Sequence, residues 1–178
     1  MTQPSILVAG LGNIFMGDDA FGVEVVRRLA ARELPDSVRV VDFGIRGFDL
    51  AYALMDGQDV TILVDATARG GDPGTIYTIE PDLDEIDILS NEQMAVEPHG
   101  MNPMKVLAMV KSMGGAPKRI LLVGCEPATL GPEEGLMGLS VPVQAAVDEA
   151  VPLIESLIAQ MVNEDSTRNI FRMWMTND

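Results

Sequence analysis

Short apolar runs alternate along the chain with segments that have the periodicity of amphipathic helices. The runs lie at residues 6–9, 38–41, 60–64 and 119–123, and they are typical of buried strands. Between them, apolar residues recur every three or four positions, as they do on the buried face of a helix. Strands alternating with helices predict a three-layer α/β/α sandwich around a mainly parallel, twisted sheet of about five strands.

Four helices follow from the same pattern. They are predicted after residues 18–19, over residues 48–55, from Asn102 with Pro103 at the first helical position, and from about Pro142 to Met161. The inward residues are Val23, Val26, Ala30 and Leu34 in the first helix and Val143, Val147, Ala150, Ile154, Leu157 and Ile158 in the last. Gly114 and Gly115 end the third helix, and Pro152 is expected to kink or divide the last one.

Residues 75–80 predict one further strand of a different kind. The link to it from the strand at 60–64 is too short for a parallel crossover, so this strand is antiparallel or lies at an edge. The acidic residues 81–99 that follow predict a long surface loop, and loops of that length are often functional.

The chain length of 178 residues favours one domain, which we assign to residues 1–162. Residues 163–178 form a polar tail that we expect to be poorly ordered. No feature of the sequence demands a self-interface, so we expect a monomer.

The net charge of −15 bears on the class of partner, because such a surface repels nucleic acids and anionic membranes. Cys125 is the single cysteine, which excludes an internal disulfide and a zinc site with two thiolates. The first basic residue is Arg27, and no apolar run approaches the roughly 20 residues of a membrane span, so we expect a cytoplasmic protein with no secretory signal.

Candidate chemistry lies after the predicted strands. In open α/β sheets, ligands bind at the carboxyl edge, where Asp19, Asp42 and Asp65 follow the first three strands. The single histidine, His99, lies in the long loop and can reach the same edge. Two carboxylates and an imidazole suit a first-row divalent metal with open coordination positions.

Structural roles are the alternative for each of these residues. Asp18 and Asp19 can cap the helix that follows them, Asp65 can cap a turn, and His99 can be an ordinary loop residue. A dinucleotide site is disfavoured, because Phe15 stands where the third glycine is needed and two acids would repel a pyrophosphate.

Four segments carry a resemblance to a known family. They are GLGNIFMGDD at residues 10–19, VDA at 64–66, PHGM at 98–101 and VGCEP at 123–127. In order and spacing over roughly residues 5–160, the chain resembles the nickel–iron hydrogenase maturation endopeptidases.

The resemblance implies an enzyme that removes a carboxyl-terminal extension from the large-subunit precursor of a [NiFe] hydrogenase once nickel is in place. It implies that Asp19, Asp65 and His99 are the metal-binding trio. The metal is nickel, held by the precursor or bound at the trio, with zinc or another divalent ion as a further candidate. The trio then either binds the nickel of the precursor or holds a cation that activates water for attack on the amide.

The resemblance also implies a fourth site residue. Asp42 matches the carboxylate that opens the family's Asp-Gly-Gly-Thr segment, and it ranks ahead of Asp18 and Glu97 as a nearby base or as a residue that holds a ligand. Here the segment begins Asp42-Phe43-Gly44, with Phe43 in place of the first glycine and no threonine, which puts the identity of the precursor in doubt.

Two other functions are alternatives to the endopeptidase. One is a nickel-sensing protein of hydrogenase assembly that binds the precursor without cutting it. The other is a peptidyl-tRNA hydrolase, which also begins Gly-Leu-Gly-Asn but needs a histidine soon after the turn and a basic face for tRNA. The pair Asp18-Asp19 and the net charge of −15 disfavour it.

Overall fold

The computed structural model describes residues 3–88 and 102–175, with side chains up to residue 164. Among these residues, five strands form one sheet in the order β2-β1-β3-β5-β4. The strands are β1 (Ile6–Leu11), β2 (Val38–Gly44), β3 (Val60–Ala66), β4 (Ile76–Ile79) and β5 (Ile120–Cys125). All neighbouring pairs are parallel except β4 with β5, so the predicted antiparallel edge strand is confirmed.

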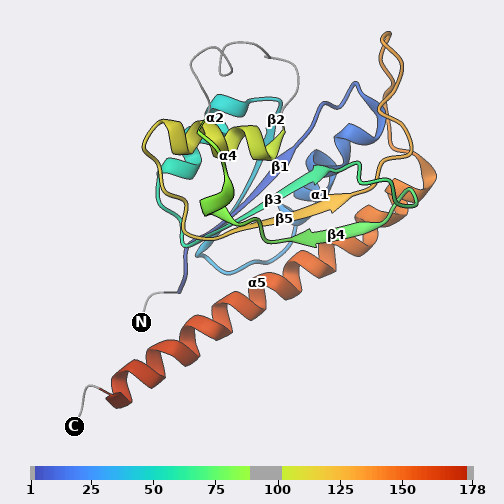
Figure 1. Cartoon of the computed structure of the whole chain (residues 1–178). Helices are drawn as coiled ribbons and strands as arrows, with labels where there is room; N and C mark the ends of the chain where they lie inside the picture. Colours follow the sequence, from blue (N-terminus) through green and yellow to red (C-terminus); the bar gives the residue numbers. More distant parts are fainter. Residues whose placement is uncertain (1–2, 89–101, 176–178) are drawn as a thin grey trace.

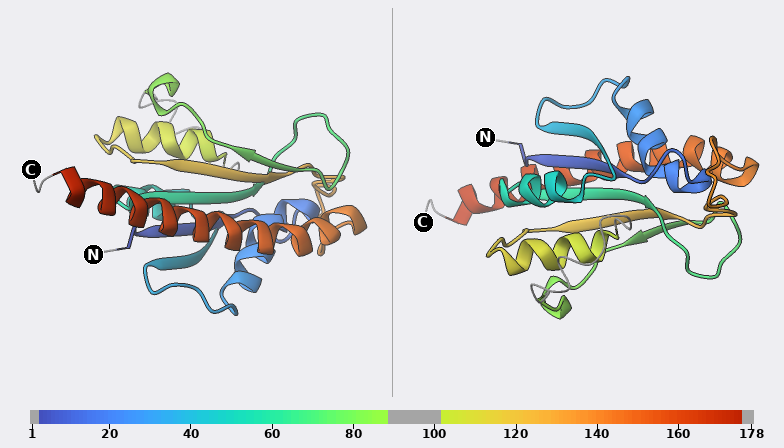
Figure 2. Two further views of the ribbon diagram at one scale, coloured as in Figure 1. Left: turned by 90° about the horizontal axis from the view of Figure 1, so that it is seen from below. Right: turned by 90° about the horizontal axis from the view of Figure 1, so that it is seen from above.

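Helices cover both faces of the sheet, as predicted. They are α1 (Phe21–Leu29), α2 (Gly47–Met55), α4 (Pro103–Ser112) and α5 (Val141–Met175), together with the 3-10 turns η1 (Gly17–Ala20) and η2 (Leu83–Glu85). α1 and α5 pack on one face, whereas α2 and α4 pack on the other. Figure 1 shows this arrangement, and Figure 2 shows α5 in front of the sheet from below and behind it from above. The three-layer sandwich is therefore confirmed.

The alternation of side chains along each strand divides the apolar core in two. In β1, Ile6 and Val8 point toward α1 and α5, whereas Leu7, Ala9 and Leu11 point toward α2 and α4. Every residue of β1 and β5 is buried, as expected for central parallel strands covered on both faces.

The four parallel strands all continue beyond the apolar runs that predicted them, β1 to Leu11 and β5 to Cys125 among them. β2 continues to Gly44 and β3 to Ala66, so Asp42 and Asp65 lie within the strands rather than after them. The apolar runs end at Val41 and Val64, whereas the backbone pairing continues through Asp42 and Asp65.

The first helix is shorter than predicted. α1 ends at Leu29, and Ala30 is exposed, so the prediction that Ala30 faces inward is wrong. Val25 and Leu29 are the buried residues there instead. Leu34 does pack against the core as a partly buried residue, but it lies beyond the end of the helix.

The last helix is one unbroken element up to Met175, longer than the predicted 142–161. Its inward residues are as predicted, with Leu157 only partly buried. Pro152 does not divide it, because it lies on the exposed face, where the carbonyl that loses its donor can bind water. An ion pair from Arg28 to Asp148 joins α1 to α5, and Arg32, just beyond the end of α1, pairs with Glu155 of α5. None of the described helices combines the length and apolar character needed to cross a membrane.

The ends of α4 are as predicted. The Asn102 side chain accepts a hydrogen bond of 2.9 Å from the amide of Met104, and Pro103 follows at the first position. At the other end, Gly114 has a φ of +83°, and the amide of Gly115 donates to the carbonyl of Val110 at 2.9 Å.

The loop after β5, residues 126–140, is fastened to the loop after β1. The fully buried carboxylate of Asp18 accepts hydrogen bonds from the amides of Ala128 (2.8 Å), Thr129 (3.1 Å) and Ser140 (2.7 Å). The Ser140 hydroxyl donates to it as well, at 2.9 Å. Burial raises the pKa of Asp18, but these donors outweigh that effect and hold the pKa below its usual 3.8.

We expect Asp18→Asn to lower the free energy of unfolding at pH 7 by about 2–3 kcal/mol, because an amide cannot accept from all of these donors. The pKa of Asp18 is lower in the folded state than in the unfolded state. Its stabilisation is therefore present above about pH 4 and is lost as the pH falls toward the folded-state value. Urea unfolding of both proteins from pH 7 to pH 3 should show the difference shrinking with acid. The exposed Asp36→Asn is the matched control, and a difference that does not shrink between pH 7 and pH 3 would contradict this role of Asp18.

Candidate functional site

The first strand and the first helix meet at two glycines that leave no room for a side chain. A Cβ on Gly22 would lie 2.0 Å from the carbonyl oxygen of Val64 and 2.5 Å from that of Leu11. A Cβ on Gly10 would lie 2.3 Å from the Val26 side chain. This close approach seats the start of α1 on β1 and β3, at the point where the strand order of the sheet reverses.

A third glycine positions Asp19. Gly12 has a φ of +128°, and a Cβ on it would lie 1.7 Å from the carbonyl oxygen of Asp19. The carboxylate of Asp19 accepts a hydrogen bond of 2.7 Å from the amide of Asn13. Asp19 therefore binds its own loop rather than the free amides of a helix, and neither Asp18 nor Asp19 caps η1 or α1. The glycine turn and the first acid of the site are one compact unit.

Asp65 lies near the end of β3 and is buried, with 5% of its surface exposed. Burial raises the pKa of its carboxyl well above the usual 3.8, and the negative charge of Asp19 raises it further. η1, which carries Asp19, packs against β3, which carries Asp65. The structure thus brings together two of the predicted site residues.

These two carboxyl groups lack a cationic partner among the described side chains, since neither Asp19 nor Asp65 forms an ion pair there. A divalent cation fits this pair, because oxygen ligands suit such ions and the positive charge offsets the repulsion that opposes ionisation of Asp65. Within the part of the chain that the structure describes, no group of three potential metal ligands occurs. The third predicted ligand, His99, lies outside the described residues.

Asp42 lies on the far side of β1 from Asp65. It pairs with Gly10 in the sheet, while Gly10 pairs on its other side with Val64. By the alternation of β2 and β3, Asp42 points toward the face of α1, whereas Asp65 points toward the face of α2 and α4. The carboxylate of Asp42 lies 3.8 Å from Nε of Arg27 and is partly exposed. The structure therefore does not bring Asp42 together with Asp65.

Sequence reasoning missed the role of Glu126. Its carboxylate accepts hydrogen bonds from the amides of Arg69 (2.8 Å) and Gly70 (3.2 Å) and from the hydroxyl of Tyr77 (2.9 Å). The amide of Arg69 contributes most to holding the pKa of Glu126 below its usual value. Glu126 thereby fixes the segment that follows Asp65. An acid next to a proline in VGCEP, directly after a buried strand, was the available signal.

Cys125 carries no sign of nucleophilic chemistry. It is fully buried, and burial, with the charges of Asp18 and Glu126, raises the pKa of its thiol to about 12. A thiol with so high a pKa is protonated at neutral pH and is a poor nucleophile.

Known proteins share both the sequence and the fold. The sequence model of the family described as hydrogenase maturation protease (HycI) matches residues 23–157. The chain is 33% identical to the hydrogenase 2 maturation protease of Escherichia coli K12 over 158 residues, which cover 88% of this chain and 90% of that protein. It is 35% identical to the hydrogenase expression/formation protein HupD of Rhizobium leguminosarum bv. viciae over 159 residues, which cover 86% of this chain and 75% of that protein.

A solved structure agrees with this relationship. The hydrogenase maturating endopeptidase HybD from E. coli superposes with a TM-score of 0.68 at 30% identity, covering 87% of this chain and 92% of that one. The resemblance inferred from the four sequence segments is confirmed by these matches. The chain belongs to the hydrogenase maturation protease family.

Proposed function

We propose that this protein is an endopeptidase that removes the carboxyl-terminal extension of a nickel-loaded [NiFe] hydrogenase large-subunit precursor. The observation that carries the proposal is the buried Asp65 beside Asp19 at the switch point of the sheet, in a chain of this family. Two carboxyl groups that disfavour each other's ionisation suit a site completed by a cation.

Asp19, Asp65 and His99 are the proposed metal ligands. Asp19 is oriented by the amide of Asn13 and by the backbone contact with Gly12, and Asp65 is held by its place in β3. His99 supplies the nitrogen ligand from the segment that precedes α4. A rigid pair of acids on one side and a histidine from a separate segment leave open positions for a substrate.

The metal of the reaction is nickel carried by the precursor, with zinc or another divalent ion as the alternative occupant of the same ligands. A cation at these residues supplies Lewis acidity toward the scissile amide. The contribution of the chain itself is to hold the carboxylates fixed, with no described Lys or Arg side chain paired to them.

Asp42 we assign a supporting role. Asp42 contacts Arg27 and points toward the face of α1. Both features favour an effect on the shape of the carboxyl edge of the sheet over a role as a metal ligand. Asp42→Asn should therefore lower the rate of processing by less than about tenfold, because the ten- to hundredfold range applies to groups that hydrogen-bond the ligands themselves.

The partner is the precursor protein. The net charge of −15 disfavours nucleic acid and anionic membrane surfaces as partners and opposes self-association, which supports a monomer. We place the activity in the cytoplasm. The second candidate function is a nickel-sensing protein that binds the precursor without cleaving it.

The decisive test measures the intact mass of a co-produced, nickel-loaded precursor with and without this protein. We expect the loss of a short carboxyl-terminal peptide, dependent on nickel. Asp19→Asn, Asp65→Asn and His99→Ala should each slow processing by more than about a hundredfold, because each removes a ligand. The exposed Asp56→Asn is the matched control. An unchanged mass with a stable complex would favour the non-cleaving protein, and full activity in a ligand variant would contradict the trio.

Binding of a cation can be measured apart from activity. Ni²⁺ or Zn²⁺ at about 100 times its Kd should raise the free energy of unfolding by about 2.7 kcal/mol, seen as a higher melting temperature. Asp19→Asn and Asp65→Asn should abolish the shift, and Asp42→Asn should retain it. A shift that survives in Asp65→Asn would contradict the ligand assignment. No shift in the wild type would contradict a resident metal and leave the nickel of the precursor as the ion that meets the trio.

A further inference from the structure

Large apolar side chains gather at the carboxyl edge on the two loops that Asp18 joins. We call them the loop-tip patch: Phe15, Leu130, Leu136 and Met137. Phe15 is 58% exposed and Met137 is 65% exposed. Backbone bonds make the patch continuous, because the amide of Leu136 donates to the carbonyl of Phe15 at 2.8 Å and the amide of Gly17 donates to the carbonyl of Leu136 at 2.8 Å.

The patch lies next to the candidate metal ligands. The side chain of Asn13 accepts a hydrogen bond of 2.9 Å from the amide of Phe15, and the amide of Asn13 donates to the carboxylate of Asp19 at 2.7 Å. Two hydrogen bonds thus connect the start of the patch to Asp19. A molecule bound at Asp19 is within reach of the loop tip.

The tip is held in place rather than free. Besides the bonds to Leu136, the amide of Asp18 donates to the carbonyl of Thr129 at 3.0 Å, and the buried carboxylate of Asp18 binds both ends of the loop. An apolar surface that is fixed before binding loses little conformational entropy when a partner docks. Exposed apolar groups gathered in this way mark an interaction site.

The charge around the patch indicates the chemistry of its partner. Residues 12–19 and 126–140 contain neither Lys nor Arg, and two of their acids, Asp18 and Glu126, are buried. Glu133 and Glu134 are both exposed between Leu130 and Leu136. Opposite charges across an interface speed association and exclude wrong partners. A second copy of this chain, with its net charge of −15, would be repelled.

We infer that the loop-tip patch is the docking surface for an apolar segment of the precursor polypeptide that carries Lys or Arg beside its apolar side chains. This inference rests on the proposed function and deepens it, since it names where the protein substrate is held while its scissile bond lies at Asp19. The patch sets the affinity for substrate, and the carboxylates set the chemistry.

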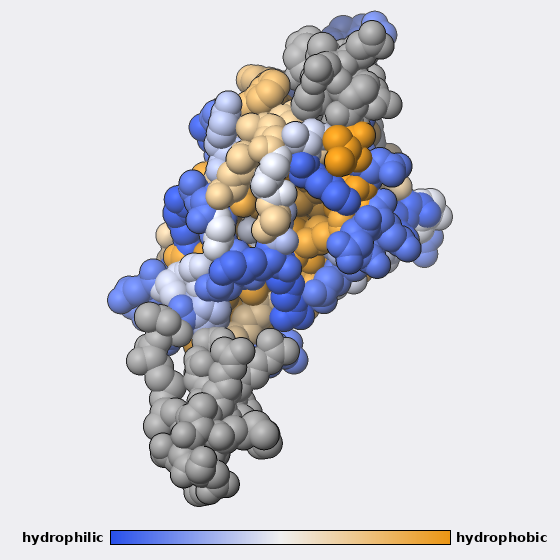
Figure 3. Space-filling model, turned by 60° about the vertical axis from the view of Figure 1, so that its left-hand side comes forward, coloured by the Kyte–Doolittle hydropathy of each residue, from blue (hydrophilic) through white to orange (hydrophobic). Residues whose placement is uncertain are grey.

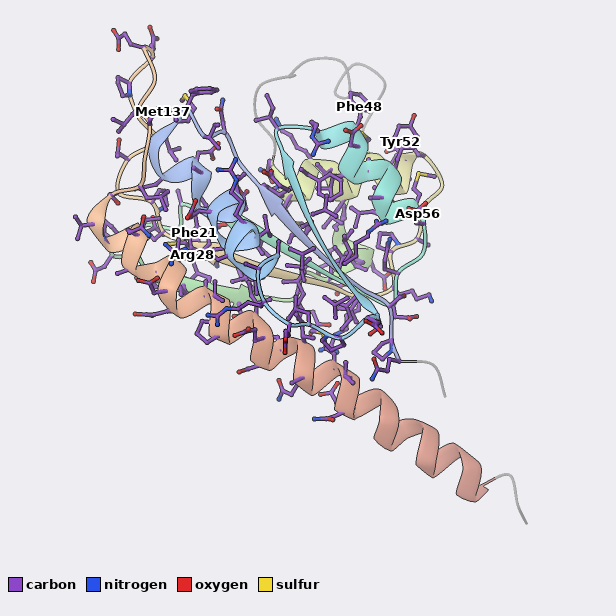
Figure 4. All side chains as sticks on the ribbon, turned by 180° about the vertical axis from the view of Figure 1, so that it is seen from behind. Phe21, Arg28, Phe48, Tyr52, Asp56 and Met137 are labelled. Carbon is purple, nitrogen blue, oxygen red and sulfur yellow. The ribbon has the colours of Figure 1, made fainter. Side chains whose placement is uncertain are left out.

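A second exposed apolar surface serves as the internal control. The α2 stripe consists of Ile45, Phe48, Tyr52 and Met55. Figure 4 shows Phe48 and Tyr52 on α2, well away from Met137 in the loop of residues 126–140. Figure 3 shows apolar surface among hydrophilic residues on the side of the molecule where α2 lies. Phe48→Ser is therefore matched to Phe15→Ser in residue type and exposure but not in location.

The experiment measures binding of the nickel-loaded precursor to full-length protein that carries Asp65→Asn, so that cleavage does not remove the complex. Phe15→Ser and Met137→Ser should each weaken binding by about tenfold, as loss of a central apolar contact does, and Phe48→Ser should have no effect. In the protein with Asp65 intact, the same two variants should raise KM and leave kcat unchanged. Glu133→Lys combined with Glu134→Lys should weaken binding most at low salt.

Each outcome has one meaning. Unchanged affinity in Phe15→Ser and Met137→Ser overturns the inference, and so does a loss confined to Phe48→Ser. If the wild-type protein self-associates and the Phe15→Ser variant is a monomer, the patch binds a second copy of the chain. That result overturns the inference as well. A wild type that neither binds nor cleaves the precursor contradicts the proposed function itself, whereas cleavage without an effect of the patch variants contradicts only the docking surface.

Discussion

The close contact between the first strand and the first helix is the constraint on which the candidate site depends. Gly10 and Gly22 let α1 approach β1 and β3 to distances at which any Cβ would overlap backbone or side-chain atoms. Gly12 then lets the chain turn tightly enough for its own backbone to touch that of Asp19. Without these contacts, the helix would move outward and carry Asp19 away from Asp65. The apolar core tolerates no such shift, because β1 is buried on both faces.

Two adjacent acids on this turn differ in burial and in hydrogen bonding. Asp18 and Asp19 both lie in η1, yet Asp18 is fully buried and bound by four hydrogen bonds, whereas among the described residues Asp19 has one bond, to Asn13. The donors around Asp18 stabilise its charge and lower its pKa, so it holds the loop after β5 as a fixed anion. Asp19 keeps most of its capacity to accept bonds for a ligand. The division of structural and chemical roles between neighbours follows from which loop each side chain meets.

The sequence predicted the fold well because each central strand is a short apolar run and each helix has a clear inner face. The same reasoning failed where tertiary contacts decide. Asp42 was expected beyond its strand near Asp65, but pairing with β1 extends β2 through it and the alternation of the strand turns it toward Arg27. The anchoring by Asp18 and Glu126 joins loops distant in sequence, which no local pattern encodes. Asp65 stood out in sequence because it directly follows the apolar run of a predicted strand, at the edge of the sheet where ligands bind. A charged residue at that place is costly to bury.

That cost also bears on how such a site can be selective. Among the described side chains, Asp65 is buried without a cationic partner, and the charge of Asp19 opposes its ionisation. A neutral peptide gains nothing from this repulsion, whereas a segment that brings a divalent cation relieves it. In the proposed function, the affinity of the acids for a substrate then depends on the metal that the substrate carries, while the proposed apolar contacts at the loop tip hold loaded and unloaded chains equally. On this proposal, discrimination between loaded and unloaded chains resides in the electrostatics of two carboxyl groups, so it depends on their rigid placement by the glycines of the turn.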